Sequence, residues 1–372
     1  MQVNAKRICS LLVAMVLAIS LLAGCAGGGQ NSSPAQSSES EAQGGPESSV
    51  EADEPSQPDN ENPNEMPPDL LPTDKIAVRV GALKGPTGMG LVGLMDKNAK
   101  GAALADYTFT LEGAPDVVQG PLVNGDLDIA ILPTNLAAVL YNKTQGAVQL
   151  IAVSGMRVLY VMAAPGVEIA SVADLKGKTL FTAGQGSTQE YVLDYLLRQN
   201  GLDPAADLKI EYKAEQAETM AQLLAGSCDA ALLPQPFVTN AVVKNPEVKR
   251  ALDVTAEWEK ITGGSQLPMS CVVVRKEFAQ EHPEAVAAFL QEYDESTQWV
   301  GENIEEAATL IGEYEIVPEA VAKLAIPDSA IQCQTGPEVE AAVNAYLKVL
   351  LDQNPKSVGG ALPDEGFFYK AE

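Results

Sequence analysis

The residues with the clearest potential for binding chemistry form a turn, Lys-Gly-Pro-Thr-Gly-Met-Gly, at positions 84–90. Its glycines allow a ligand to approach the backbone closely. It is not a P-loop, because the lysine precedes the glycine instead of preceding Ser or Thr. We expect a polar or anionic group to sit here at a helix N-terminus, although a plain turn with a solvated lysine is the alternative. The candidate binding residues are Lys84, which offers a charge, Thr87, which offers a hydroxyl, and Gly85, Pro86, Gly88 and Met89.

A second turn, Gly-Gln-Gly-Ser-Thr-Gln-Glu at positions 184–190, has a similar character. A Ser or Thr followed by Gln or Glu in the first turn is typical of a helix cap, and capping alone would explain these residues. Its position matches that of the first turn, which favours binding. The candidates here are Gln185, an amide facing Lys84, together with Gly186, Ser187 and Thr188.

Two further pairs of polar or rigid residues follow apolar strands: Thr134-Asn135 and Gln235-Pro236. Side chains at strand ends emerge toward a crevice, so both pairs are candidates for ligand binding, although Asn135 could instead cap the helix that follows it. Phe237, Trp258 and Tyr160 could stack on a planar solute, but lone aromatic residues in apolar surroundings belong more often to the core.

The sequence offers little for catalysis, metals or cofactors. Asp128 and Asp229 recur at equivalent places in two copies of one pattern, which indicates a structural role. The single histidine of the chain, His282, lies in a helix-start signal, so a His-based triad or multi-histidine metal site is not expected. Beyond the signal region the cysteines are sparse and odd in number, without C-x-x-C spacing, so free buried thiols or one disulfide are both open. We expect no catalytic residue, no metal and no cofactor.

Strand-like and helix-like segments alternate through the chain. The pattern predicts strands at 76–82, 107–111 and 127–132, and helices at 88–97 and 115–123. This alternation is typical of βαβ units on a mainly parallel sheet flanked by helices.

An internal repeat organises these segments. A shift of 101 positions aligns Gly85 with Gly186, Thr87 with Thr188, and the block 130–133 with 231–234. We therefore expect two similar α/β lobes, with the turns and strand ends named above lining a cleft between them, because ligands bind at the carboxyl ends of strands in open α/β sheets.

The charge of the chain excludes one class of partner. The net charge is −26; residues 26–74 hold 11 acids and no Lys or Arg, and the first 25 residues hold +2, so −17 remains for residues 75–372. An acidic body of this size argues against nucleic-acid binding.

The N-terminus predicts export and lipidation. Lys6 and Arg7 precede an apolar run at 8–22, which is too short for a membrane span and is typical of a signal peptide. Ala23 and Gly24 then precede Cys25, and this order resembles a bacterial lipobox, in which the thiol receives a diacylglyceryl group. An ordinary signal with an incidental cysteine is the alternative. Residues 26–72 are rich in Ser, Gly, Pro and acids without one aromatic, which predicts a flexible tether.

Over residues 76–300 the chain resembles the solute-binding proteins of ABC importers, in particular the nitrate/sulfonate/taurine and thiamine-pyrimidine-precursor group. The resemblance rests on the segment 172–178, the 184–188 turn, the Gly-x-x-Asp-x-Ala-x-Leu-Pro strands, and the segments 272–278 and 281–284. The 84–89 turn departs from the usual pattern, which puts the transfer of a substrate in doubt.

The resemblance implies a type II periplasmic-binding-protein fold with a hinge between two lobes. Lobe one would hold residues 75–164 and 266–372, lobe two residues 165–265, with crossings near Ala164 and Gln266. It further implies a monomeric, extracytoplasmic receptor, anchored to the cell membrane through lipid, that closes on a small polar or anionic solute and delivers it to an ABC permease.

Two other functions share this fold. One is an enzyme of pyrimidine or menaquinone-precursor metabolism; the pyrimidine makers depend on an active-site histidine, and export of this chain also argues against this class. The other is an extracellular ligand sensor. Binding without turnover, beside a permease, distinguishes the importer function from both.

Overall fold

The structure is a computed structural model that describes residues 75–370 of the chain. Cys25 and the tether expected at 26–72 therefore lie outside the described residues. Within the described part, no helix is long and apolar enough to cross a membrane. The polypeptide forms two sheets, one of six strands in the order β11-β4-β10-β3-β1-β2 and one of five strands in the order β7-β6-β8-β5-β9. We name the two halves built on these sheets lobe one and lobe two.

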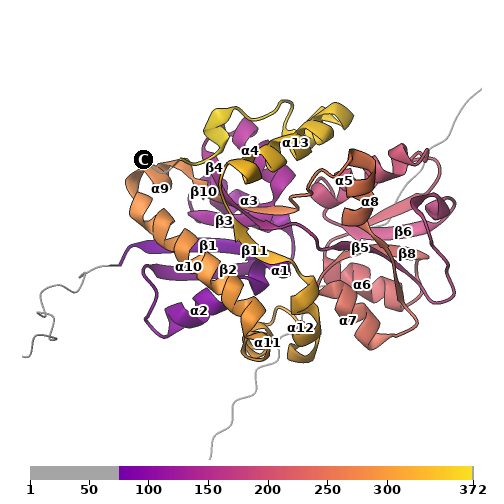
Figure 1. The fold of residues 1–372 in the computed structure, drawn as a ribbon, viewed down its shortest axis with the longest axis horizontal. Helices are drawn as coiled ribbons and strands as arrows, with labels where there is room; N and C mark the ends of the chain where they lie inside the picture. The colour runs from indigo at the N-terminus through magenta and orange to yellow at the C-terminus, as the bar shows by residue number, and fades with distance from the viewer. Residues whose placement is uncertain (1–74, 371–372) are drawn as a thin grey trace, which may run out of the picture. The chain divides into compact units, whose positions relative to one another are not determined.

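Lobe one is a sheet covered on both faces (Figure 1). Its strands are β1 (Ala77–Leu83), β2 (Asp106–Glu112), β3 (Ile129–Pro133), β4 (Val148–Gly155), β10 (Ser270–Arg275) and β11 (Ile331–Gln334). Helices α2 (Val92–Ala99), α9 (Lys276–Glu281) and α10 (Pro283–Glu302) pack on one face, and α3 (Pro115–Asn124), α4 (Thr134–Lys143) and α13 (Pro337–Gln353) pack on the other. The remaining helices are α1 (Pro86–Met89), α11 (Ile304–Glu313) and α12 (Glu319–Ala325), with short 3-10 turns at Ile326–Asp328, Pro355–Val358 and Glu365–Phe367.

Lobe two repeats this plan on a smaller scale. Its strands are β5 (Leu159–Ala163), β6 (Thr179–Ala183), β7 (Lys209–Lys213), β8 (Ala230–Pro234) and β9 (Lys249–Asp253). Helices α5 (Thr188–Gln199) and α8 (Val254–Thr262) cover one face, and α6 (Gln216–Leu224) and α7 (Phe237–Lys244) cover the other (Figure 1). Because strands covered on both faces exclude water, their side chains are almost all apolar; the burial of Ile129–Leu132 is complete.

The 101-residue repeat corresponds to one topology used twice. The spatial order β2-β1-β3-β10-β4 in lobe one matches β7-β6-β8-β5-β9 in lobe two. In both lobes the first three of these strands are parallel, whereas β10 and β5 run antiparallel to both of their neighbours. Four of the six strands in lobe one and four of the five in lobe two run in the same direction, so each sheet is mainly parallel, as expected. The reversed strands are β10 and β5, which the chain inserts after crossing from the other lobe, and β11 at the edge of lobe one.

The chain passes between the sheets at two places. It leaves β4 in lobe one at Gly155 and enters β5 in lobe two at Leu159, earlier than the crossing expected near Ala164. The reason is that the apolar segment after Gly155 pairs with β8 and β9 and so already belongs to lobe two. The return lies between Thr262 and Ser270, around the expected position of Gln266.

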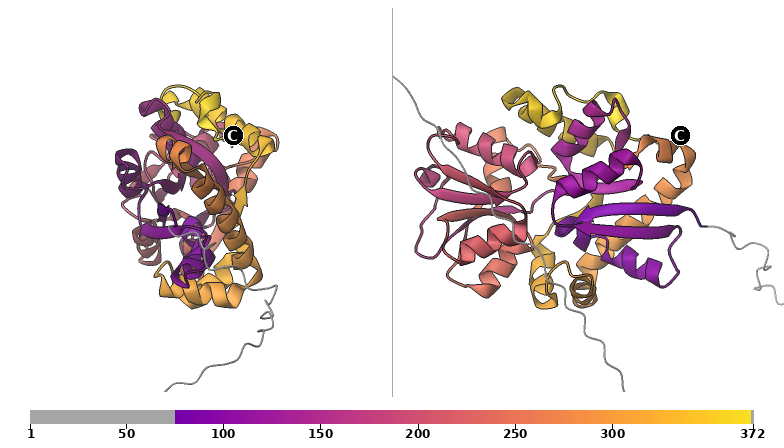
Figure 2. Two further views of the ribbon diagram at one scale, coloured as in Figure 1. Left: turned by 90° about the vertical axis from the view of Figure 1, so that its left-hand side faces the viewer. Right: turned by 180° about the vertical axis from the view of Figure 1, so that it is seen from behind.

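The C-terminal helices complete lobe one, as expected, and α13 also touches lobe two. It packs against α4 of lobe one and against α5 of lobe two. Seen from behind, in the right-hand view of Figure 2, this yellow helix lies over the junction of the two lobes. A single core cluster includes Tyr346 of α13 and Trp258 of α8, whose rings lie 5.8 Å apart.

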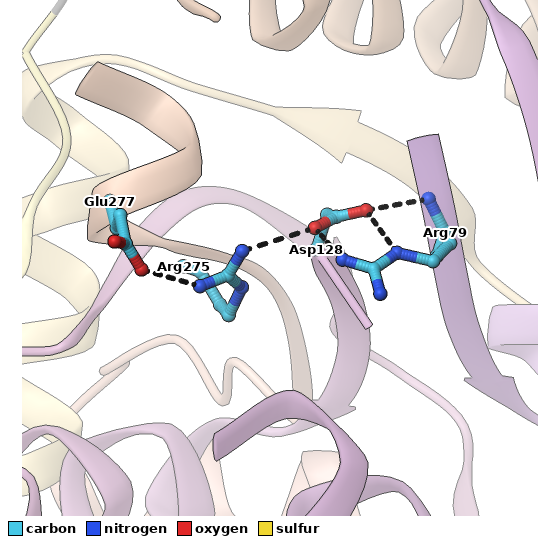
Figure 3. A network of polar contacts seen from close by, with 4 residues as sticks. All are labelled: Arg79, Asp128, Arg275 and Glu277. Atoms are coloured by element: carbon cyan, nitrogen blue, oxygen red, sulfur yellow. Dashed lines mark hydrogen bonds and ion pairs between the residues drawn. The ribbon is translucent and has the colours of Figure 1, made fainter. Parts of the chain in front are cut away.

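The repeated aspartates hold the strands of the two copies together. Asp128 accepts hydrogen bonds from the Arg79 backbone N–H (3.0 Å) and guanidinium (2.8 and 2.6 Å) and pairs with Arg275 at 3.4 Å (Figure 3). Among residues 75–370, Asp229 accepts only the Thr179 backbone N–H, at 2.7 Å. The structural role inferred for both carboxylates is therefore visible in their contacts.

Candidate functional site

A cavity of about 100 Å³ lies where the two lobes meet. It is lined at the carboxyl ends of the parallel strands, where the repeat predicts a cleft. Lobe one contributes Leu83, Lys84, Gly85, Pro86, Thr87, Gly113, Pro115, Leu132, Pro133, Met269 and Ser270, and lobe two contributes Val158, Ala183, Gly184, Ser187, Thr188, Gln189, Ala214, Gln216 and Pro234. Lys84 is the one titratable side chain in this lining, so the cavity presents a single charge among apolar and neutral polar groups.

The first predicted turn contributes its beginning to the cavity and its end to the core. Lys84 through Thr87 line the cavity, whereas Met89 packs in a cluster with α11 and α12. Gly88 is buried, and a Cβ there would stand 2.9 Å from the Leu83 carbonyl. The Thr87 hydroxyl donates to the Leu83 carbonyl at 2.9 Å and accepts from the Leu83 N–H at 3.2 Å. It is thus committed to its own turn, and the lysine is the polar side chain that this turn leaves for a ligand.

The second turn places the N-terminus of α5 at the cavity. Gly184 and Gly186 adopt φ of +73° and +77°, the left-handed region that favours glycine, and so reverse the chain from β6 into the helix. The Ser187 hydroxyl bonds back to the Gly184 carbonyl, and the Glu190 carboxylate accepts from the Gly186 N–H.

No side chain caps α5, which leaves backbone donors at its start. Ser187 stands at the N-cap but uses its hydroxyl elsewhere. The N–H groups of Thr188 and Gln189, both cavity-lining residues, donate no hydrogen bond within the described residues. An uncapped helix start with free N–H groups and a positive dipole end favours an anion.

Asn135 and Thr188 belong to a buried network between the lobes. The Asn135 amide donates to the carbonyls of Gly186 and Ser357, both at 3.0 Å, and its oxygen accepts from the Thr188 hydroxyl at 3.1 Å. Tyr346 of α13 donates to that same hydroxyl at 3.0 Å. Asn135 therefore neither caps a helix nor lines the cavity; it ties the α5 turn to lobe one.

The strand-end residues lie one step away from the cavity. Pro133 and Pro234 line it, whereas Thr134 and Asn135 are fully buried in α4, which begins directly after the strand and turns their side chains away. Gln235 is also fully buried, and its oxygen accepts from the Thr239 N–H and hydroxyl. Pro236, at the N-cap of α7, is not among the cavity-lining residues. Gln185 is exposed and lines an adjoining groove instead.

The other side chains considered for chemistry lie elsewhere. Trp258 and Phe237 are buried in the cores, and Tyr160 is half-buried beneath Arg250, so the core interpretation of these aromatics holds. His282 is half-exposed beside Glu284 at the start of α10. Among residues 75–370 the three cysteines are free thiols, and no group of three metal-ligating side chains lies close together.

Three polar residues of the lining were not predicted from the sequence: Gln189, Gln216 and Ser270. The Gln216 amide donates to the Gln189 oxygen at 2.8 Å, and its own oxygen is buried without a partner. The Ser270 hydroxyl accepts from Ser154 at 2.9 Å, which leaves its proton for another acceptor. The repeat could have found Gln216, because the 101-residue shift aligns it with Pro115, which lines the cavity from lobe one.

Comparisons with known proteins agree with this geometry. Residues 108–316 match the family model described as "ABC transporter, phosphonate, periplasmic substrate-binding protein". No curated protein matches the sequence.

Solved structures share the fold at low identity. An ABC transporter protein from Parabacteroides distasonis is 24% identical, with a TM-score of 0.65 over 80% of this chain and 100% of that chain. The aliphatic sulphonate binding protein SsuA from Escherichia coli is 18% identical, with a TM-score of 0.65 over 80% and 92% of the two chains. The nitrate-binding protein NrtA from Synechocystis PCC 6803 is 15% identical, with a TM-score of 0.58 over 76% and 84%.

These neighbours establish the two-lobed periplasmic-binding-protein fold expected from the sequence, and the group to which they belong is the one that the sequence resembles. The family model covers more than half of the chain, including the 184–190 turn of lobe two that lines the cavity. The chain therefore belongs to the phosphonate family of periplasmic substrate-binding proteins of ABC transporters.

Proposed function

We propose that this protein captures a small solute bearing a phosphonate, sulfonate or similar oxyanion in the cavity between its lobes and delivers it to an ABC permease. The observation that carries the proposal is the uncapped start of α5, where Thr188 and Gln189, whose N–H groups make no hydrogen bond within the described residues, line the cavity that Lys84 lines from the opposite lobe. Backbone donors and one lysine, in a lining without carboxylates, suit an oxyanion.

The same lining supports binding without turnover. Acid-base or nucleophilic catalysis needs a titratable or activated group at the substrate, and Lys84 is the one titratable side chain here. The hydroxyls of Thr87, Ser187 and Thr188 are all engaged in bonds within the protein. The cavity can therefore hold an oxyanion but has no evident base to activate a nucleophile.

The direct test is calorimetric titration and thermal melting with methylphosphonate, ethanesulfonate and nitrate. A true ligand at about 100 times its dissociation constant should stabilise the fold by ~2.7 kcal/mol. Absence of any shift with all three oxyanions would overturn the proposal.

The charge of Lys84 provides a sharper test. Lys84→Ala should weaken binding of the effective oxyanion by roughly tenfold, ~1.4 kcal/mol, because one charged donor is lost. Lys244→Ala is the matched control, because Lys244 is exposed at the end of α7, outside the cavity lining. Equal affinities of the two variants would remove Lys84 from the site.

We further propose that Cys25 carries the lipid that anchors the receptor outside the cytoplasm, with the acidic segment 26–74 as its tether. In full-length chains expressed in a bacterium, Cys25→Ser should abolish labelling with a clickable palmitate analogue and move the protein out of the membrane fraction. Labelling that persists in the variant would contradict the anchor.

A further inference from the structure

A second hollow, which we call the outer groove, adjoins the cavity. It has a volume of about 480 Å³, and both lobes line it. Pro115, Gly184 and Ala214 border the cavity on one side and the outer groove on the other, so the groove lies at the rim of the cavity. Its other lining residues are Ala114, Asp116, Gln119, Leu136, Val139, Lys143, Gln185, Gly186, Tyr191, Lys213 and Lys356.

The charge of the outer groove is opposite to that of the protein. Lys143, Lys213 and Lys356 line it together with a single carboxylate, Asp116. The chain as a whole carries −26. Three lysines from α4, β7 and the 3-10 turn at Pro355–Val358, far apart in the sequence, converge at the rim of an otherwise acidic body. A local positive field of this kind raises the concentration of anions at the groove.

Two of these lysines have no competing partner. Ten of the 17 lysines in residues 75–370 form ion pairs with carboxylates, and Lys213 is one of them, at 3.0 Å from Glu211. Within the described part of the chain, Lys143 and Lys356 make no ion pair and no side-chain hydrogen bond. Their ammonium groups are exposed and free to pair with an anion that enters the groove.

The inner cavity and the outer groove differ in size. The cavity, at about 100 Å³, is several times smaller than the outer groove, at about 480 Å³. A solute longer than the cavity can extend past Pro115 and Gly184, which border both hollows.

We propose that the solute is an anion at both ends: an oxyanion held at the start of α5, and a second anionic group, such as a carboxylate or phosphate, received by Lys143 and Lys356. This inference rests on the proposed function and deepens it. It predicts that phosphonates or sulfonates with a carboxylate at the far end bind more tightly than their amine-ended and uncharged analogues. An ammonium group in the groove would be repelled by the lysines there, and an alkyl end would gain no ion pair.

The test compares three ligands of similar length: 3-phosphonopropionate, 3-aminopropylphosphonate and butylphosphonate, with longer homologues of each. Titration at low salt should show the carboxylate binding about tenfold tighter than the alkyl compound and the amine binding weakest, with the preference shrinking as salt is raised. The double variant Lys143→Ala/Lys356→Ala should lose this preference while retaining the parent affinity for butylphosphonate. Lys244→Ala should change neither value, and melting curves confirm that each variant is folded.

The outcomes separate this inference from the proposed function. Binding of butylphosphonate with no advantage for the carboxylate, or an advantage that survives in the double variant, overturns the two-ended solute and leaves the oxyanion receptor in place. Failure of the parent protein to bind any of these phosphonates or the matching sulfonates overturns both.

Discussion

Asp128 shows how one buried carboxylate gains a structural role. The residue is 2% exposed and lies between Arg79 and Arg275. Burial by itself would raise its pKa, but the hydrogen bonds and charge of Arg79 outweigh burial and hold the pKa below its usual value. Such a carboxylate stabilises the folded state above the pKa of the unfolded chain, and this stability is lost as the pH falls through the lowered folded pKa.

Removing the charge should expose this contribution. Asp128→Asn should lower the free energy of unfolding by about 2–3 kcal/mol at neutral pH, because Arg79 and Arg275 lose their common partner. The difference between the variant and the parent should narrow as the pH falls below about 4, where the carboxylate of the unfolded chain begins to protonate, and should vanish once the pH lies below the lowered pKa of the folded carboxylate. Urea melts between acidic and neutral pH measure both effects.

The repeat provides the control for this substitution. Asp229 accepts a single backbone N–H and no arginine, so Asn at that position keeps an acceptor and should cost little. If Asp229→Asn and Asp128→Asn destabilise the protein equally, the contacts of Asp128 with Arg79 and Arg275 are not the source of the lost stability.

The three cysteines among residues 75–370 should be unreactive in the folded protein. Burial raises the pKa of the Cys228 thiol to about 11 and those of Cys271 and Cys333 to about 12. Because the thiolate is the reactive form, labelling by a disulfide reagent near pH 8 should be slow in the native state and fast after unfolding. Rapid labelling of the native body would contradict this burial.

At the scale of elements, the turn before α5 decides where the helix aims its N–H groups. Gly186→Ala places a side chain at φ +77°, and no atom would clash with the new Cβ. The variant should therefore lose ~1–2 kcal/mol of unfolding free energy through backbone strain alone. Gly101→Ala is the matched control, because Gly101 has φ +72°, an equally open Cβ position and no place in the cavity. Both variants should lose similar stability in urea melts, but only Gly186→Ala should weaken oxyanion binding. Equal affinities would show that the turn does not position the donors.

The junction of α13 with α5 depends on one buried hydroxyl. Tyr346→Phe should cost about 0.5–1.5 kcal/mol of stability, because the buried Thr188 hydroxyl loses its donor while it still donates to Asn135. Tyr293→Phe is the control: Tyr293 is equally buried, and its hydroxyl lies near Ser154 without meeting full hydrogen-bond geometry within the described residues. That variant should be neutral or slightly stabilising in the same melts. A larger loss for Tyr293→Phe than for Tyr346→Phe would argue against the network.

At the scale of the whole body, a surface ion pair joins the lobes. Arg250 of β9 lies 2.7 Å from Asp328 of lobe one, and both side chains are partly exposed, so the pair is worth about 0.2–1 kcal/mol. If the lobes open by a hinge, Asp328→Asn should shift the solute-free population toward an open form, seen as a larger radius of gyration in solution scattering, and solute should restore the parent value. The charge-swapped double variant Arg250→Asp/Asp328→Arg should recover the compact form. An unchanged radius would exclude this pair as a closing contact.

Much of this architecture could be predicted from local patterns. Apolar runs of strand length, separated by Gly and Pro, placed four of the five predicted elements of lobe one within two residues. The helix predicted at 88–97 begins later, as α2, because a short helix, α1, precedes it. The 101-residue repeat predicted two lobes with a shared topology, and the turns at Lys84 and Gly184 were correctly placed at their junction. These features follow from backbone periodicity and glycine conformation, which neighbouring residues determine.

Only the tertiary structure decided which polar side chains line the cavity and which are hydrogen-bonded inside the protein. Thr87, Thr188 and Asn135 are polar residues at the expected places, yet packing commits their side chains to internal hydrogen bonds. Gln189 and Gln216 meet because two helix starts converge, and Lys143 and Lys356 share a groove although they lie far apart in the chain. The local sequence determines where strands and helices begin and end. The direction in which a side chain points depends on segments that become its neighbours only when the chain folds.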